Sequence, residues 1–292
     1  MASERSHPEE SLLVIREMTA ADIEFAVACT HEAGWQSEGP DIFDFFLRHD
    51  PRGCFVAEVD GRKGGICVAT GYERHGFIGE LVVTRDMRLL GLGRRLFGRA
   101  LAYLQARGFE NVYLDGDLNA VPFYEEMGFK KICRSLRFRG RIPGKKGSCV
   151  RRVRPADMDA LCEMDKNFFG DERDFFLRLQ MSRYPQLGFV LEGSPLGGYI
   201  MARPGDGLLA VGPWAVEGGA ASAAALLEHL SLDTGEPLLR IGVLENNVRA
   251  LSLLRSFSGL EETSFSWFMG RGPSSRLGNH PGLYAIGSGA KG

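Results

Sequence analysis

The segment Leu81-Val-Val-Thr-Arg-Asp-Met-Arg-Leu-Leu-Gly-Leu-Gly-Arg-Arg-Leu96 is the most informative part of this sequence. It reads as a buried strand, a polar loop, and then Arg88-x-x-Gly91-x-Gly93 at the start of an amphipathic helix. The first N–H groups of a helix lack intrahelical partners and carry partial positive charge, and glycines let phosphate oxygens approach the backbone. Arg88 and Arg94 add positive charge. The segment therefore predicts a pyrophosphate site.

Two glycines before a helix are compatible with three other kinds of loop. A glycine-rich turn before a surface helix accounts for a bare pair of glycines. A dinucleotide fold needs a third glycine where this chain has Leu96, and needs the loop to follow its strand directly. A P-loop needs Gly-Lys-Ser/Thr, which does not follow here. The dinucleotide fold and the P-loop are therefore excluded, whereas the sequence does not exclude a plain glycine-rich turn.

The elements expected around this segment alternate between strands and helices. Three strands separated by turn residues predict an antiparallel meander, and an apolar stripe ending at Gly108 predicts a helix. The expected strands are 12–16, 53–59, 65–72, 77–84 and 112–115, and the expected helices are 19–33, 92–107 and 121–127.

The beginning of the sequence recurs after a stretch rich in Gly, Pro and Lys. Residues 14–23 are echoed by 149–158, with Arg16 matching Arg151 and Asp22 matching Asp157, and residues 124–129 are echoed by 255–260. Two echoes in the same order predict a duplicated domain. We expect a disordered tail at 1–10, a first domain at 11–142, a linker at 143–148, and a second domain at 149–292. The first domain and the second domain are called the first half and the second half below.

Two motifs in the first half resemble those of the GNAT acyltransferases. Arg88-Leu-Leu-Gly-Leu-Gly93 is similar to the Q/R-x-x-G-x-G/A signature of that family, and Leu81-Val-Val83 to its preceding strand. Asn119-Ala-Val-Pro-Phe-Tyr-Glu-Glu-Met-Gly-Phe129 resembles the family's later short helix. The resemblance implies an α+β (α/β layered) fold of tandem GNAT domains. Each would be a mixed, mostly antiparallel sheet splayed between strands 4 and 5 and flanked by helices.

The resemblance also implies which residues hold acetyl-CoA, or another short acyl-CoA, as co-substrate. Backbone groups of Leu81, Val82 and Val83 would bind pantetheine, and Asn119 would contact the cofactor or serve as a helix N-cap. The pyrophosphate would lie on the backbone of Arg88, Leu89, Leu90, Gly91, Leu92, Gly93 and Arg94.

The resemblance places Tyr124 where the family often has its general acid, and the alternative is a core aromatic. The attacking amine must lose a proton, and Glu80 is the candidate base, with a solvent-facing strand carboxylate as the alternative. Trp35 and Phe45 fall where the family builds its acceptor pocket. The stripe Phe43, Phe46 and Leu47 beside them is typical of plain core.

The second half lacks the parts that would hold acyl-CoA. Glu217-Gly-Gly-Ala stands in place of the glycine loop, without the arginine or the G-x-G spacing, and Arg255 takes the position of Tyr124. An acidic side chain there would repel phosphate. We therefore expect the first half to carry catalysis. Three roles are left for the second half: it completes the acceptor pocket, it mediates dimerisation, or it stabilises the first half by packing. A homodimer is compatible with the sequence.

The sequence thus predicts a transferase: an N-acetyltransferase that moves an acetyl group to a primary amine, with a small molecule as the expected acceptor. A non-catalytic acyl-CoA sensor and an acetyltransferase for protein lysines or N-termini are the alternatives.

Composition restricts the classes of partner and the cellular compartment that we expect. A net charge of -2 and a pI of about 6.3 do not indicate the basic surface that binds nucleic acid. No apolar run reaches the roughly 18 residues that span a membrane. The polar first residues do not form a secretory signal. Six cysteines without C-x-x-C spacing indicate buried thiols rather than disulfides or a metal site. We expect a cytoplasmic protein without a metal.

Overall fold

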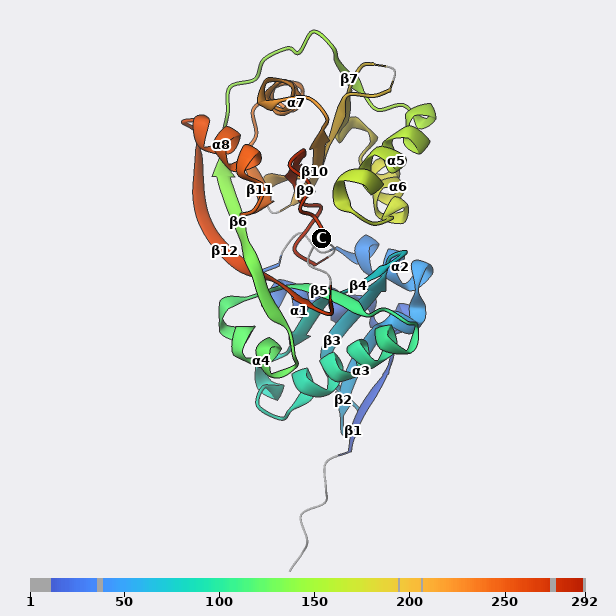
Figure 1. The fold of residues 1–292 in the computed structure, drawn as a ribbon. Helices are drawn as coiled ribbons and strands as arrows, with labels where there is room; N and C mark the ends of the chain where they lie inside the picture. Colours follow the sequence, from blue (N-terminus) through green and yellow to red (C-terminus); the bar gives the residue numbers. More distant parts are fainter. Residues whose placement is uncertain (1–11, 36–38, 194, 206, 274–276, 291–292) are drawn as a thin grey trace, which may run out of the picture. The chain divides into compact units, whose positions relative to one another are not determined.

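The computed structural model describes residues 12–35, 39–193, 195–205, 207–273 and 277–290 (Figure 1). The tail expected at residues 1–10 lies outside them. The chain forms two compact units, and each is described by itself. The first unit comprises Met1–Val68 and Glu80–Tyr103, and the second comprises Ala69–Gly79 and Leu104–Gly292.

The first unit is an antiparallel sheet covered by helices. β1 pairs with β2, and β2 pairs with β3. Phe43 and Phe46 are buried against residues of β2 and β3, which confirms that this aromatic stripe is core. The elements that lie wholly or partly in this unit are β1 (Leu13–Glu17), α1 (Ile23–Glu32), α2 (Pro40–His49), β2 (Cys54–Val59), β3 (Arg62–Gly71), β4 (His75–Val83) and α3 (Leu92–Ala106).

The start of α1 is set by local polar contacts. Thr19 and Asp22 form a capping box around a single 3₁₀ turn. Asp22 also accepts hydrogen bonds from Arg16 at 2.7 and 2.9 Å. The matching residues of the second half, Arg151 and Asp157, make the same two contacts at 2.6 and 2.9 Å. The repeated sequence thus builds the same strand-to-helix corner twice.

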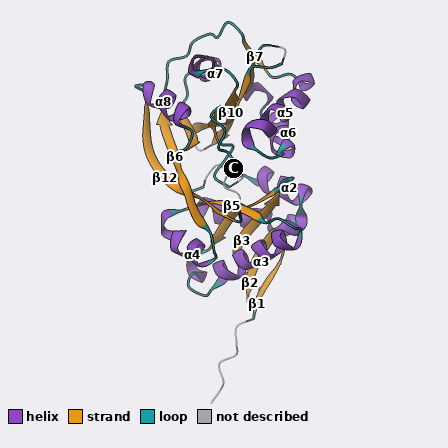
Figure 2. Ribbon diagram, in the orientation of Figure 1, coloured by secondary structure: helices purple, strands orange, loops and turns teal. Residues whose placement is uncertain are grey.

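The second unit contains a long mixed sheet with helices on it (Figure 2). Its strands follow the order β5-β12-β6-β11-β10-β9-β8-β7, and the first residues of β4 pair with β5. The strands are β5 (Asn111–Gly116), β6 (Lys130–Gly140), β7 (Val150–Arg152), β8 (Gly188–Leu191), β9 (Gly198–Gly205), β10 (Leu208–Val216), β11 (Leu239–Leu244), β12 (Leu260–Arg271) and β13 (Leu283–Ala285). The helices are α4 (Val121–Glu126), α5 (Met158–Phe169), α6 (Asp174–Arg183), α7 (Ala220–Asp233) and α8 (Val248–Ser256).

Two long strands exchange places between the halves of the sequence. β12, the last long strand of the second half, pairs with β5 and places Trp267 opposite Gly116. β6, which ends the first half, pairs with β11 and places Ser135 opposite Leu244. β6 and β12 also run antiparallel to each other, as Figure 1 shows. Side chains of the second half therefore lie directly beside β5.

The sheet is split at equivalent points of the two halves. β4 and β5 pair in parallel over His75–Phe77 and Asn111–Tyr113 only. β10 and β11 likewise pair in parallel over Leu209–Val211 and Leu239–Ile241 only. Beyond these three pairs the partner strands no longer pair with each other. The predicted mixed sheets splayed between their fourth and fifth strands are confirmed.

Candidate functional site

The loop before α3 has the backbone shape expected of an anion-binding turn. Leu89 and Gly91 both adopt left-handed backbone, with φ of 68° and 77°. A Cβ at Gly91 would meet no atom within 4 Å, so its backbone faces open space. α3 then runs for 15 residues from Leu92, which gives its N-terminus a full dipole. These features fit a pyrophosphate, and the φ of residue 91 favours glycine.

Charge and packing fix this loop within the first unit. Arg88 is exposed and donates from Nε to the Val83 carbonyl at 3.3 Å, which ties the loop back to the end of β4. A Cβ at Gly93 would have Val83 Cγ2 as its nearest atom, at 3.7 Å. Leu81 and Val83 are half-buried, and Val82 is buried. The residues assigned to pantetheine and pyrophosphate thus lie on one continuous strand–loop–helix segment.

Glu80, the candidate base, lies in β4 with an unusual backbone. Its φ is 51°, and the residue is 1% exposed. The alternative of a solvent-facing carboxylate is therefore wrong. A left-handed non-glycine residue costs about 1–3 kcal/mol, and such residues cluster at functional sites. The backbone at this point of β4 is consistent with a functional role for Glu80.

Tyr124 lies in the second unit, on α4. Its ring packs over the end of β5, because a Cβ at Gly116 would lie 3.0 Å from two of its ring carbons. The residue is 9% exposed. Phe123 and Tyr124 have ring centroids 5.2 Å apart. Tyr124 is thus a core residue that packs on the last residue of β5.

Asn119 is not a helix N-cap. It lies inside the 3₁₀ turn Leu118–Ala120, and its backbone N–H donates to Asp117 Oδ1 at 3.0 Å. Asp117 is the cap of this turn, because it precedes the turn and its side chain accepts the Asn119 N–H. That alternative for Asn119 is therefore wrong.

The two residues expected in the acceptor pocket occupy separate places in the first unit. Trp35 follows α1 and is 39% exposed. Phe45 lies on α2 and stacks on His49, with ring centroids 6.0 Å apart. They remain candidates.

In the second half, the chain itself fills the split. β13 pairs with β10 at Trp214 and Ala215, past the point where β10 and β11 separate. The next residue, Ile286, donates its N–H to the Gly242 carbonyl of β11 at 2.9 Å. Arg255, which replaces Tyr124, forms an ion pair with Glu262 at 3.0 Å. The split between β10 and β11, which corresponds to the one between β4 and β5, is thus occupied by the chain's own C-terminal segment.

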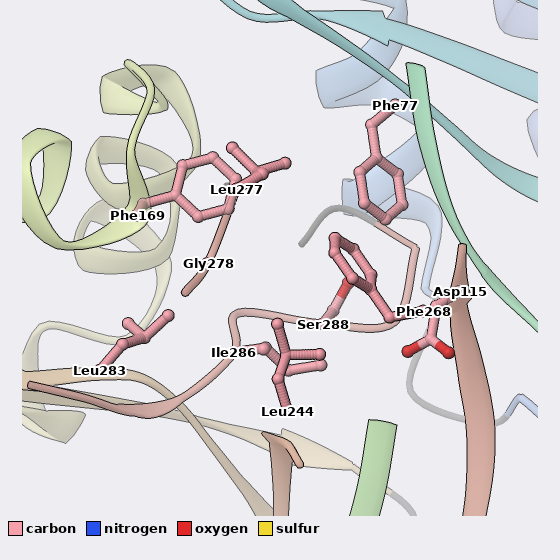
Figure 3. A pocket seen from close by; sticks show the side chains of 10 residues that line it. All are labelled: Phe77, Asp115, Phe169, Leu244, Phe268, Leu277, Gly278, Leu283, Ile286 and Ser288. Carbon is pink, nitrogen blue, oxygen red and sulfur yellow. The ribbon is translucent and has the colours of Figure 1, made fainter. Parts of the chain in front are cut away.

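A carboxylate that the sequence analysis did not select lies at the other split. Asp115 is on β5, its side chain is 3% exposed, and its Oδ2 accepts from Arg137 Nη2 of β6 at 2.7 Å. It lines a pocket together with apolar residues of both halves (Figure 3). In the sequence, Asp115 differs from its neighbours only as a charged residue at the end of the apolar run Val112-Tyr-Leu-Asp115. Its partners are distant in the sequence, so this feature alone does not identify it as a site residue.

Two family models match the sequence and together cover most of it. The model described as the Acetyltransferase (GNAT) family matches residues 20–129, and the model described as an Acetyltransferase (GNAT) domain matches residues 161–285. The chain is a tandem member of the GNAT acetyltransferase family. A search of the curated proteins finds no match.

Solved structures share this tandem GNAT fold. A Pyrococcus horikoshii protein assigned to the acetyltransferases is 23% identical over 99% of this chain and 100% of its own, with a TM-score of 0.82. A GCN5-related N-acetyltransferase from Sphaerobacter thermophilus is 16% identical over 91% and 98%, with a TM-score of 0.61. At these identities the likeness concerns the fold. The likeness to the first protein extends over its whole length.

Three further observations concern the described part of this GNAT protein. None of its helices has the length and apolar character needed to cross a membrane. No group of three or more His, Cys, Asp or Glu side chains is arranged there to hold a metal ion. Its six cysteines are free thiols, and all except Cys149 are buried. Burial raises the pKa of the Cys54 thiol to about 12, so this thiol is unreactive.

Proposed function

We propose that this GNAT protein transfers an acetyl group from acetyl-CoA to a primary amine of a small molecule. The observation that carries the proposal is the turn before α3, with left-handed Leu89 and Gly91 and an open face over Gly91. Backbone N–H groups of Arg88–Arg94 would hold the pyrophosphate, with Arg88 and Arg94 adding charge. Leu81–Val83 would hold the pantetheine arm. Acetyl-CoA supplies an activated thioester.

The residues of the chain would then handle the protons. Glu80 accepts a proton as the amine becomes a neutral nucleophile. The amine nitrogen bonds to the thioester carbonyl carbon, the carbon–sulfur bond breaks, and the departing thiolate takes a proton from the Tyr124 hydroxyl. The nitrogen then gives its extra proton to the Tyr124 phenolate, which leaves a neutral amide and restores the acid. Burial of Glu80 and the position of Tyr124 at the end of β5 support these roles.

The first half would carry the whole reaction. Its counterpart lacks the glycine loop, has Arg255 for Tyr124, and has β13 in its split. Free thiols are typical of a reducing compartment, which supports a cytoplasmic enzyme with access to acetyl-CoA.

A matched pair of glycine variants tests the cofactor assignment. Gly93→Glu places a carboxylate at the first turn of α3, where it would repel phosphate. Gly98→Glu makes the same change farther along α3, where a Cβ meets no atom within 4 Å. Acetyl-CoA should raise the melting temperature of the wild type and of Gly98→Glu, and should leave that of Gly93→Glu unchanged. An equal shift in both variants, or none in the wild type, would contradict the assignment.

A further inference from the structure

Helix α4, which carries the proposed acid Tyr124, is too short to hold its position alone. It has six residues, Val121–Glu126, and only Val121 and Tyr124 among them are buried. Isolated helices of fewer than about 12 residues are marginal in water, and in proteins most of their stability comes from packing against other elements. The position of the Tyr124 hydroxyl therefore depends on the contacts that fix α4 from outside.

The C-terminal end of α4 is fixed by a residue of the second half. Phe129 N–H donates to the Tyr124 carbonyl at 3.0 Å, so the chain turns sharply where the helix ends. Arg271, the last residue of β12, donates from Nη1 to the Met127 carbonyl at 3.2 Å. A Cβ at Gly128 would lie 3.8 Å from Arg271 Nε. Basic side chains commonly bind the last carbonyls of a helix, and here β12 supplies one.

The ring of Tyr124 is bordered by the same strand. Gly116 of β5 pairs with Trp267 of β12, and directly opposed residues project to the same face with Cβ positions about 5 Å apart. The Tyr124 ring takes the space of a side chain at Gly116, because two ring carbons lie 3.0 Å from a Cβ built there. Lys131 Nζ lies 5.4 Å from the centroid of the Trp267 ring and pairs with Glu125 of α4 at 3.0 Å. A second connection from β12 to α4 results.

We infer that Arg271 is a positioning residue for Tyr124, and that β12 of the second half, through Arg271 and Trp267, sets where the proposed proton donor lies. This inference rests on the proposed function, and it gives the second half a part in the reaction. All the residues concerned belong to the second unit. Arg271 acts on the end of α4 and takes no part in proton transfer itself.

A proton donor is sensitive to small displacements. The donor must come within about 2.6–3.2 Å of the atom that it protonates, and a misplacement of about 1 Å can lower the rate about 100-fold. Tyr124 precedes Met127 by less than one turn of helix, so freeing the Met127 carbonyl loosens the turn that carries Tyr124. The loop proposed to bind acetyl-CoA lies in the first unit. We therefore expect the effect in kcat and not in cofactor binding.

Hydrogen exchange without acetyl-CoA tests whether Arg271 holds α4. Arg271→Met removes the donor and keeps a long side chain. The N–H groups of Gly128 and Phe129, which close the end of the helix, should exchange at least about tenfold faster than in the wild type. Arg141→Met is the control, because Arg141 donates in the same way to the Glu236 carbonyl after α7, and it should leave these N–H groups unchanged. Unchanged exchange in Arg271→Met would overturn the inference.

A double-mutant cycle tests whether the effect passes through Tyr124. It compares wild type, Arg271→Met, Tyr124→Phe and the double variant by release of free thiol. Arg271→Met alone should lower kcat about tenfold and change the KM of acetyl-CoA less than about twofold. In the Tyr124→Phe background it should lower kcat less than about twofold, because the hydroxyl that it positions is already absent. Equal losses in both backgrounds would show that Arg271 does not act through Tyr124.

Further variants separate this inference from the proposed function. Full activity of Tyr124→Phe would remove the acid role and the inference with it, whereas a slow Tyr124→Phe beside a fully active Arg271→Met would remove the inference only. Arg271→Lys keeps a donor and should restore kcat to within about threefold of wild type. If Arg271→Met does not fold, Trp267→Leu enters the same cycle with the same expectations, and wild-type kcat in Trp267→Leu would then overturn the inference.

Discussion

Arg16 and Asp22 form a two-fold hydrogen-bonded ion pair that joins the end of β1 to the start of α1. The Asp22 side chain is 1% exposed, and it also pairs with Lys63. Arg151 and Asp157 repeat the arrangement, although Asp157 is 13% exposed. The corner is thus stabilised by the same contacts in both halves, with different degrees of burial.

This difference predicts unequal costs for equivalent substitutions. Asp22→Asn removes a nearly buried charge that two cations share, and we expect it to lower the free energy of unfolding by about 2 kcal/mol. Asp157→Asn removes a more accessible one and should cost about 1 kcal/mol. Urea denaturation at pH 7 measures both. A larger loss of stability in Asp157→Asn would show that burial does not determine how much each ion pair contributes to the free energy of unfolding.

The same pair predicts a dependence on pH. The hydrogen bond from Arg16 holds the pKa of Asp22 well below its usual range, with Lys63 and Thr19 adding to the effect. A lowered carboxyl pKa stabilises the folded state above the unfolded pKa of about 3.9, and the stabilisation is lost as the pH falls toward the folded value. The stability difference between wild type and Asp22→Asn should be constant from pH 8 to 5 and shrink below about pH 4. A difference that grows on acidification would have the wrong sign.

Removing the hydroxyl of Tyr124 should affect turnover rather than cofactor binding. Tyr124→Phe keeps the ring over Gly116 and removes the proposed proton donor. We expect kcat to fall about 100-fold or more, with the Kd of acetyl-CoA nearly unchanged. Steady-state release of free thiol gives kcat. The control is Tyr103→Phe, whose hydroxyl bonds to Asp50 at 2.7 Å in the first unit and should cost stability only. Full activity of Tyr124→Phe would exclude the acid role.

Neutralising Glu80 should slow the reaction without unfolding the protein. Glu80→Gln keeps the shape of a buried side chain and removes its ability to take a proton. A loss of about 100-fold in kcat is expected for a general base. Glu58→Gln is the matched control, because Glu58 pairs with Arg16 on the neighbouring part of the first unit. If both variants keep wild-type rates, Glu80 is not the base.

The exchange of β6 and β12 predicts that the halves cannot fold separately. A fragment of residues 1–148 would lose β12 from both β5 and β6, and β11 from β6, which leaves three unpaired strand edges. We expect it to aggregate when expressed alone and to become soluble when co-expressed with residues 149–292. Size-exclusion chromatography with circular dichroism checks this. A monodisperse, folded 1–148 fragment would contradict the prediction.

Local signals were sufficient for the elements and for the loop. The capping residues Thr19 and Asp22, the glycines at 91 and 93, and the apolar stripe of α3 act over a few residues, so their meaning is readable from the sequence. The left-handed backbone of Glu80 was not predictable, because glutamate has no preference for it and the surrounding structure imposes it.

The amino-acid sequence by itself determined that two related copies exist, that only the first carries an Arg-x-x-Gly-x-Gly loop, and that the family is GNAT. These properties depend on residue types at short spacings. Tertiary structure alone decided that β12 completes the sheet at β5, that β13 occupies the second split, and that Asp115 meets Arg137 and Phe268. Such contacts join residues far apart in the chain. They arise from strand pairing and burial, which no local pattern encodes.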